Sequence, residues 1–86
     1  MEHELKSWPE YFNKILDGTK PFEYRINDRG FNDGDILILK EWIPLDNEYT
    51  GRRIRLLIKN IWEVIPGLPT NYCIITFRFL DYYETS

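Results

Sequence analysis

LDGTKPFEYR, residues 16–25, joins the end of a predicted helix directly to a predicted strand. Gly18 is typical of the left-handed residue that closes a helix, because glycine has no Cβ to disfavour that conformation. Beyond it, charged and amide side chains alternate with aromatic and aliphatic ones as far as Asn27, and Asp28 and Arg29 follow. A structural strand of this length needs only one or two surface charges, so this density of polar groups indicates a functional site.

The residues before this stretch predict a short strand and one amphipathic helix. His3–Lys6 is expected to be extended. Ser7 is predicted to cap the helix, with Glu10 completing a capping box and Pro9 tolerated in the first turn. The apolar residues at helical spacing are Trp8, Phe12, Ile15 and Leu16. We therefore expect a helix of about ten residues that ends at Gly18.

Strands are predicted for most of the remaining chain. The predicted strands are 22–27, 36–39, 52–64 and 72–80, and segment 42–51 is a hairpin or a long loop. Turn-forming residues separate them. The continuous apolar run Ile36–Leu39 is typical of a strand buried on both faces. One helix and about five strands joined mostly by turns predict an α+β fold with a curled antiparallel sheet.

Alternation along the second strand divides its side chains between two faces. Phe22, Tyr24 and Ile26 are predicted to face the core, and Glu23, Arg25 and Asn27 the opposite side. On that opposite face, one interpretation is an exposed ion pair worth about 0–1 kcal/mol. The other is a site in which Arg25 holds the carboxylate of Glu23 and Lys20 adds positive charge. The residues alone favour neither.

The charge balance limits the class of partner. The chain has 86 residues, a formal net charge of −3 and a pI of about 5.1. Non-specific duplex binders usually present a strongly basic face, so this balance argues against a general grip on polyphosphate. A local basic pocket for one nucleotide or a short single strand is still compatible with it.

The cysteine content and the lengths of the apolar runs exclude several classes of protein. Cys73 is the only cysteine, lies in an apolar run and is expected to be buried, so neither a disulfide framework nor a thiolate metal site is predicted. No apolar run approaches the roughly 20 residues of a membrane span, and Met1–Glu4 does not resemble a secretion signal. We expect a cytoplasmic protein with no metal, no cofactor and no membrane association.

Four further candidates have two interpretations each. Trp42 and Phe31 lie at loop mouths, where an aromatic ring stacks on a base or, more commonly, closes the end of a barrel. The only basic cluster is Arg52, Arg53 and Arg55. A solvated sheet face is favoured for it over phosphate contact. His3 is the only histidine, and an ordinary half-buried residue is commoner than a functional one.

The pattern Gly18-Thr19-Lys20-x-x-Glu23-x-Arg25, followed by Gly34-Asp35 and an apolar strand, resembles the ASCH branch of the PUA-like superfamily. A longer pattern resembles DUF3850, a small family of unknown function. It includes His3-x-Leu5-Lys6, Asn27-Asp28-Arg29 and Tyr49-Thr50-Gly51-Arg52. The resemblance covers nearly the whole chain and implies a small β-barrel with one main N-terminal helix beside a cleft.

The resemblance also implies a single ASCH/PUA-like domain over residues 1–86 and recognition of RNA or a modified nucleotide. In ASCH proteins the glycine–lysine–glutamate–arginine region is thought to line the cleft. Carried over, this implies that Lys20, Glu23 and Arg25 line a cleft here. The other residues expected to bind the ligand are His3, Lys6, Asn27, Arg29 and Trp42.

Some small ASCH proteins resemble amidohydrolases that deacylate N4-acetylcytidine with a lysine, a threonine and a glutamate. Lys20 matches that lysine, and Glu23 occupies the threonine position, so these two are the candidate catalytic residues. The sequence thus leaves three interpretations and the oligomeric state open. They are a binding module for RNA or a modified nucleotide, an amidohydrolase acting on an acylated nucleoside, and a protein-interaction domain with an inert cleft. We take the binding module as the expected function.

Overall fold

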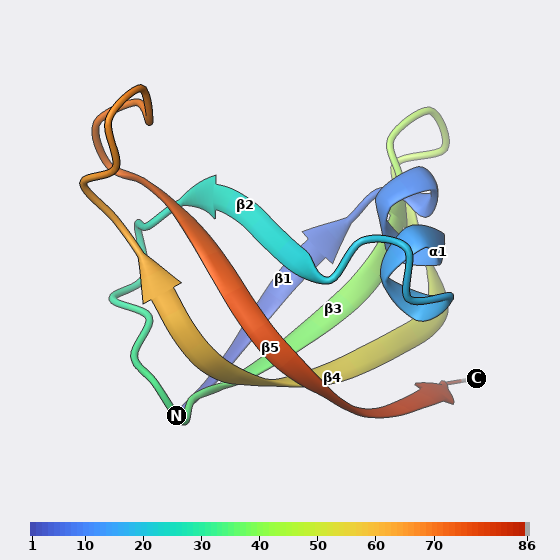
Figure 1. Ribbon diagram of the computed structural model, residues 1–86. Coiled ribbons are helices and arrows are strands. Elements are labelled where there is room, and N and C mark those ends of the chain that lie inside the picture. Colours follow the sequence, from blue (N-terminus) through green and yellow to red (C-terminus); the bar gives the residue numbers. More distant parts are fainter. Residues whose placement is uncertain (86) are drawn as a thin grey trace.

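Within residues 1–85, which the computed structural model describes, a five-stranded mixed sheet curls into a half-barrel and one helix covers its end (Figure 1). The elements are β1 (Glu2–Ser7), α1 (Pro9–Leu16), β2 (Phe22–Ile26), β3 (Ile36–Ile43), β4 (Glu48–Trp62) and β5 (Tyr72–Glu84). The strand order is β1-β3-β4-β5-β2. β1 and β2 are therefore the two edges of the sheet.

One pairing differs from the predicted antiparallel sheet. β1 pairs with β3 in parallel, whereas the other three neighbouring pairs are antiparallel. A parallel pair needs a long crossover connection. Here α1 and β2 provide that connection between β1 and β3, so the sheet is mixed and the prediction of a purely antiparallel sheet is wrong.

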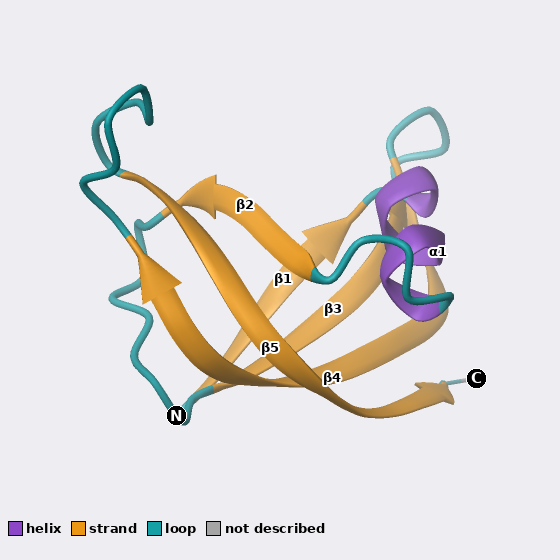
Figure 2. Cartoon of the chain, viewed as in Figure 1, coloured by secondary structure: helices purple, strands orange, loops and turns teal. Residues whose placement is uncertain are grey.

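The curl of the sheet comes from its two longest strands. β4 and β5 cross the molecule as strongly bent ribbons (Figure 2). Their register shifts between Arg55 and Leu56 and again between Ile58 and Asn60, as expected for β-bulges. A bulge bends a strand and increases its local twist. These bends bring the two sheet edges to the same side of the molecule without closing the barrel.

The N-cap of the helix lies one residue later than predicted. Ser7 is buried at the end of β1, opposite Glu41 of β3, and the N-cap is Trp8, which makes no side-chain capping hydrogen bond. Strand pairing thus overrides the capping-box pattern. Gly18 has a φ of +85°, as predicted for the residue after a helix. At eight residues, α1 is the only helix of the described chain and is too short to cross a membrane.

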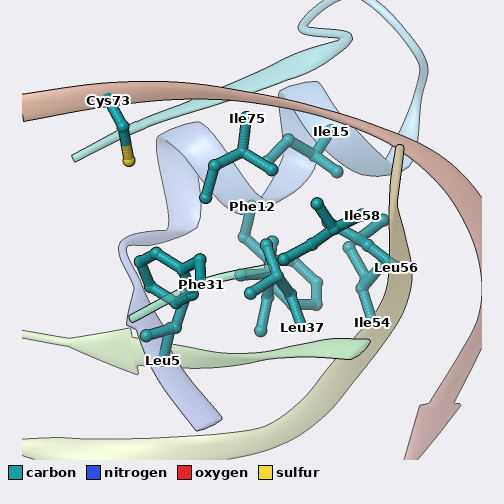
Figure 3. Close-up of a cluster of buried hydrophobic side chains, with 11 residues drawn as sticks. Leu5, Phe12, Ile15, Phe31, Leu37, Ile54, Leu56, Ile58, Cys73 and Ile75 are labelled. Carbon is teal, nitrogen blue, oxygen red and sulfur yellow. The ribbon is translucent and has the colours of Figure 1, made fainter. Parts of the chain in front are cut away.

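The core fills the concave side of the sheet (Figure 3). Its buried members are Leu5, Phe12, Ile15, Phe31, Leu37, Leu39, Ile54, Leu56, Ile58, Cys73 and Ile75. Phe31 enters from the β2–β3 loop and is only 5% exposed, so it packs in the core as the commoner interpretation predicted. Cys73 is fully buried, as expected. Burial raises the pKa of its thiol, which keeps it protonated and weakly nucleophilic.

Arg52 fastens the helix to the sheet. Its guanidinium donates to both oxygens of the buried Glu41 carboxylate, at 3.2 and 3.3 Å, and to Asn13 Oδ1 of α1 at 3.0 Å. It also lies over the Phe12 ring, 4.9 Å from the centroid. Arg52 is therefore a structural residue, whereas Arg55 forms a two-pronged ion pair with Asp81 on the outer face of the sheet.

A second buried polar contact fastens β1 to the β2–β3 loop. His3 Nε2 lies 2.8 Å from Asp35 Oδ2, and the Asn32 backbone N–H donates to the same oxygen at 3.1 Å. The hydrogen bond from His3 is the main cause that lowers the pKa of Asp35 below its ordinary value of 3.8, against the opposing effect of burial.

This contact predicts how stability depends on pH. A carboxyl group whose pKa is lower in the folded than in the unfolded protein stabilises the fold above the unfolded pKa, and the stabilisation is lost as pH falls through the folded pKa. Asp35→Asn is therefore expected to lower the melting temperature at neutral pH. The difference in melting temperature between this variant and the parent should become smaller as pH falls from about 5 to about 2. Asp33→Asn, an exposed change in the same turn, is the matched control. A gap that stays constant down to pH 2 would contradict the assignment.

Candidate functional site

The charged side chains of β2 face the inside of the half-barrel. In the antiparallel pair with β5, Glu23 lies opposite Ile75 and Arg25 lies opposite Cys73. Residues directly opposite one another share a face of the sheet, and Ile75 and Cys73 are fully buried core residues. Glu23 is accordingly only 7% exposed, and Arg25 is half-buried.

The predicted orientation of this strand is therefore wrong. Phe22, Tyr24 and Ile26 were assigned to the core, but they are 39%, 42% and 45% exposed. The alternation itself is as predicted; the two faces are exchanged. Tyr24 instead stacks on Tyr72 of β5, with ring centroids 5.2 Å apart on the outer face.

A cleft of about 770 Å³ lies where the two sheet edges face each other. We call it the seam cleft. Its lining residues come from the end of β1, the N-cap and first turn of α1, the turn before β2, β2 itself and the beginning of β5. They are Lys6, Ser7, Trp8, Tyr11, Lys20, Phe22, Glu23, Tyr24, Arg25 and Tyr72. The unclosed edge of the barrel thus provides a concave surface with aromatic rings around an ionic centre.

Lys20 and Glu23 form that ionic centre. Lys20 Nζ lies 3.4 Å from Glu23 Oε1, and both side chains are less than one-fifth exposed. The ammonium group also lies 4.9 Å from the centroid of the Tyr11 ring. Lys20 follows the turn at Gly18, and its own N–H donates to the Lys14 carbonyl at 3.0 Å, so the end of the helix sets its position.

Arg25 carries a polar atom that the fold does not satisfy. Its Nη1 is buried, and within residues 1–85 it has no hydrogen-bond partner. Leaving a buried donor unpaired costs about 1–3 kcal/mol, and more when the group is charged. Such an atom at the wall of a cleft is suited to donate to an acceptor on a ligand.

A second hollow of about 550 Å³ adjoins the seam cleft, and the two share Lys6 and Arg25. We call it the basic ledge. It is lined by Glu4, Lys6, Arg25, Arg29, Lys40 and Tyr49. Together the cleft and the ledge present five basic side chains against two carboxylates, a net of +3, in a chain whose formal charge is −3. The surface around the seam is thus locally basic in an acidic protein.

The structure brings together only part of the expected ligand-binding set. Of that set, the residues that line the cleft or the ledge are Lys6, Lys20, Glu23, Arg25 and Arg29. Trp42 lies beside them, with Lys6 Nζ 3.9 Å from its ring centroid, but it lines neither hollow. His3 and Asn27 lie apart, because His3 is buried against Asp35 and Asn27 Nδ2 donates to Glu63 at 2.6 Å.

Several lining residues were not predicted from the sequence. They are Glu4, Ser7, Trp8, Tyr11, Phe22, Tyr24, Lys40, Tyr49 and Tyr72. For Tyr11 a signal existed: it is an aromatic residue outside the predicted apolar face of the helix, and it is 43% exposed. For Lys40 no local signal existed, since its place beside Lys6 depends on the parallel pairing of β1 with β3.

The fold and site define a small α+β half-barrel with an ionic cleft at its open edge. The family model "Domain of unknown function (DUF3850)" matches residues 2–77, so the chain belongs to the DUF3850 family. The chain is also similar to an "Uncharacterized 12.9 kDa protein in GpA 3'region" of Escherichia phage P2, with 37% identity over 62 residues. That alignment covers 72% of this chain and 55% of the phage protein, so the chain spans about half of its relative.

The Arg25 guanidinium, which has one buried nitrogen without a hydrogen-bond partner within residues 1–85, is expected to lower the stability of the fold. Replacing Arg25 with Met removes a buried unpaired donor and fills its place with an apolar side chain, so the free energy of unfolding is expected to stay level or rise by about 1–3 kcal/mol. Arg55→Met is the matched control, since Arg55 is paired with Asp81 on the outer face, and this change is expected to give no gain. Chemical denaturation of both variants checks this. A loss of stability in Arg25→Met larger than that in Arg55→Met would show that Arg25 serves the fold.

Proposed function

We propose that this protein is a binding module for single-stranded RNA or a modified nucleotide, and that the ligand occupies the seam cleft. The observation that carries the proposal is the inward row of Glu23 and Arg25 on an edge strand. A core position normally takes an apolar residue, because charge burial is costly unless the charge is fully paired. A ligand that pairs with these groups explains why the strand keeps them.

The lining of the cleft supports a nucleotide in particular. Bases stack on aromatic side chains for about 1–3 kcal/mol each, whatever their sequence. Trp8 and Tyr11 offer such a platform at the rim, since they are 53% and 43% exposed and already stack on each other. Lys20 and Arg25 supply donors for carbonyl or phosphate oxygens, and Glu23 supplies an acceptor for the amino edge of a base. The volume is within the usual range for small-ligand sites, about 300–1,000 Å³.

The proposal includes a place in the ASCH branch of the PUA-like superfamily. It is supported by the convergence of Lys20, Glu23 and Arg25 on one cleft beside the single helix of the described chain. These are the residues that the glycine–lysine–glutamate–arginine pattern singles out. Recognition of RNA or modified nucleosides is what that superfamily resemblance implies.

One contact favours a second candidate function, hydrolysis of an acylated nucleoside. Lys20 Nζ lies 3.4 Å from Glu23 Oε1 inside the cleft, which puts a base and an acid within reach of the same substrate atom. With N4-acetylcytidine as the substrate, attack by water on the amide would release acetate and cytidine. Acetate formation by the parent protein that is absent in Lys20→Ala would support this candidate, and no acetate after prolonged incubation would contradict it.

Binding is tested with a fluorescently labelled eight-nucleotide single-stranded RNA at low salt, followed by anisotropy. Lys20→Ala and Arg25→Ala are each expected to weaken binding at least tenfold, because each removes a charge-assisted contact worth about 1.5–3 kcal/mol. The melting temperature of Arg25→Ala is expected to stay within a few degrees of the parent, whereas that of Lys20→Ala is expected to fall, because the buried Glu23 carboxylate loses its partner. Trp8→Ala is expected to weaken binding through lost stacking alone.

Arg55→Ala is the control, since it removes the same charge from the outer face of the sheet, at a residue that lines neither hollow. It is expected to bind like the parent. Equal losses in Arg55→Ala and Arg25→Ala would indicate a diffuse charge effect and contradict a site in the cleft. If the parent binds neither this RNA nor nucleosides, the module proposal fails and a protein partner becomes the better account.

A further inference from the structure

Three basic residues occupy directly opposite positions on β1, β3 and β4, from the seam edge of the sheet to its central strand. Lys6 of β1 is directly opposite Lys40 of β3, and Lys40 is directly opposite Arg53 of β4. Neighbouring strands are about 4.8 Å apart, and like charges directly opposite one another are destabilising. The row therefore favours an anion on this face of the sheet.

The carboxylate of Glu4 supplies part of the negative charge that this basic row favours. Its Oε1 lies 3.2 Å from Lys40 Nζ, and its backbone carbonyl accepts a hydrogen bond from Arg29 Nη1 at 3.0 Å. The Glu4 side chain is 59% exposed, whereas that of Lys40 is only 18% exposed. Solvent screens an ion pair that has one exposed partner, so a stronger anion can displace the carboxylate at little cost.

Resting on the proposed function, we infer that the basic ledge is a phosphate subsite and that Glu4 is an internal competitor for it. A phosphate group bound there contacts Lys6, Lys40 and Arg29, while the base attached to it occupies the seam cleft. Lys6 and Arg25 line both hollows, so one nucleotide or two linked ones can reach across.

The chemistry of the ledge fits phosphate better than a carboxylate. A phosphate group presents three or four acceptor oxygens, and guanidinium groups bind two of them at once. Arg29 reaches the ledge from the β2–β3 loop; its side chain is about half-exposed, and its Nε lies 3.8 Å from Oδ1 of the exposed Asp28. The Lys40 ammonium lies 4.4 Å from the Tyr49 ring centroid, which holds it on the ledge when Glu4 is displaced. The protein is thus expected to prefer nucleotides over the corresponding nucleosides.

The test compares Glu4→Gln with Glu2→Gln, which removes the same charge from the same face of β1, two residues away. With the eight-nucleotide RNA, Glu4→Gln is expected to tighten binding about threefold to tenfold, because the competing charge is gone. Glu2→Gln is expected to change it less than about twofold. Lys40→Gln is expected to weaken binding and to reduce the slope of log K against log salt by about 0.7. Cytidine, which has no phosphate, should bind Glu4→Gln and the parent alike.

Inorganic pyrophosphate separates this inference from the proposed function. In an amide-resolved NMR titration it is expected to shift Lys6, Arg29 and Lys40, with a larger response in Glu4→Gln than in the parent. Pyrophosphate shifts at these residues without RNA binding would leave the subsite standing and overturn the RNA-binding proposal. RNA binding that is equal in Glu4→Gln and Glu2→Gln would overturn the subsite and leave the proposed function standing.

Discussion

The pairing register of β2 with β5 is the constraint on which the rest of the account depends. With Glu23 opposite Ile75 and Arg25 opposite Cys73, two charged side chains point into the half-barrel beside apolar core residues. A slip of one residue would exchange the two faces, burying Phe22 and Tyr24 and exposing the charges. The ionic cleft exists only because the strand pairs in this register, at an edge where the barrel does not close.

The contacts that stabilise the fold and the candidate site are largely carried by different residues. Arg52 binds Glu41 and Asn13 on the side of the half-barrel formed by β3, β4 and α1, whereas the site uses polar groups of β2 beside the core residues Cys73 and Ile75. Along the seam, an unpaired guanidinium and adjacent lysines contribute little to the fold, and some of them oppose it. Functional sites commonly keep residues of this kind, which local rules of protein stability would disfavour. The seam is therefore the part of the molecule that a purely structural account explains least well.

Much of the fold could be predicted from local patterns, but the orientation of β2 could not. Gly18, the buried run of β3 and the burial of Cys73 follow from conformational preference and hydrophobicity, and they are confirmed. The alternation of residues correctly divided β2 into two faces. Hydrophobicity then assigned the wrong face to the core, because the inward face of β2 is decided by its pairing with another strand. The cap at Ser7 was wrong for a similar reason, since non-local pairing of β1 with β3 takes that residue into the sheet. The motif brought Lys20, Glu23 and Arg25 together, whereas the ledge depends on parallel pairing that no local pattern encodes.

The most direct test of the central claim is an amide-resolved NMR titration of the isotope-labelled protein with short single-stranded RNA at low salt. The account predicts shifts that cluster at Lys6, Tyr11 and residues 20–25, with little change at Arg78 and Phe79 on the exposed part of β5. Shifts confined to Arg55 and Asp81 on the outer face of β4 and β5 or to the loop at 63–71, or a spectrum that does not change at all, would contradict a ligand site at the seam.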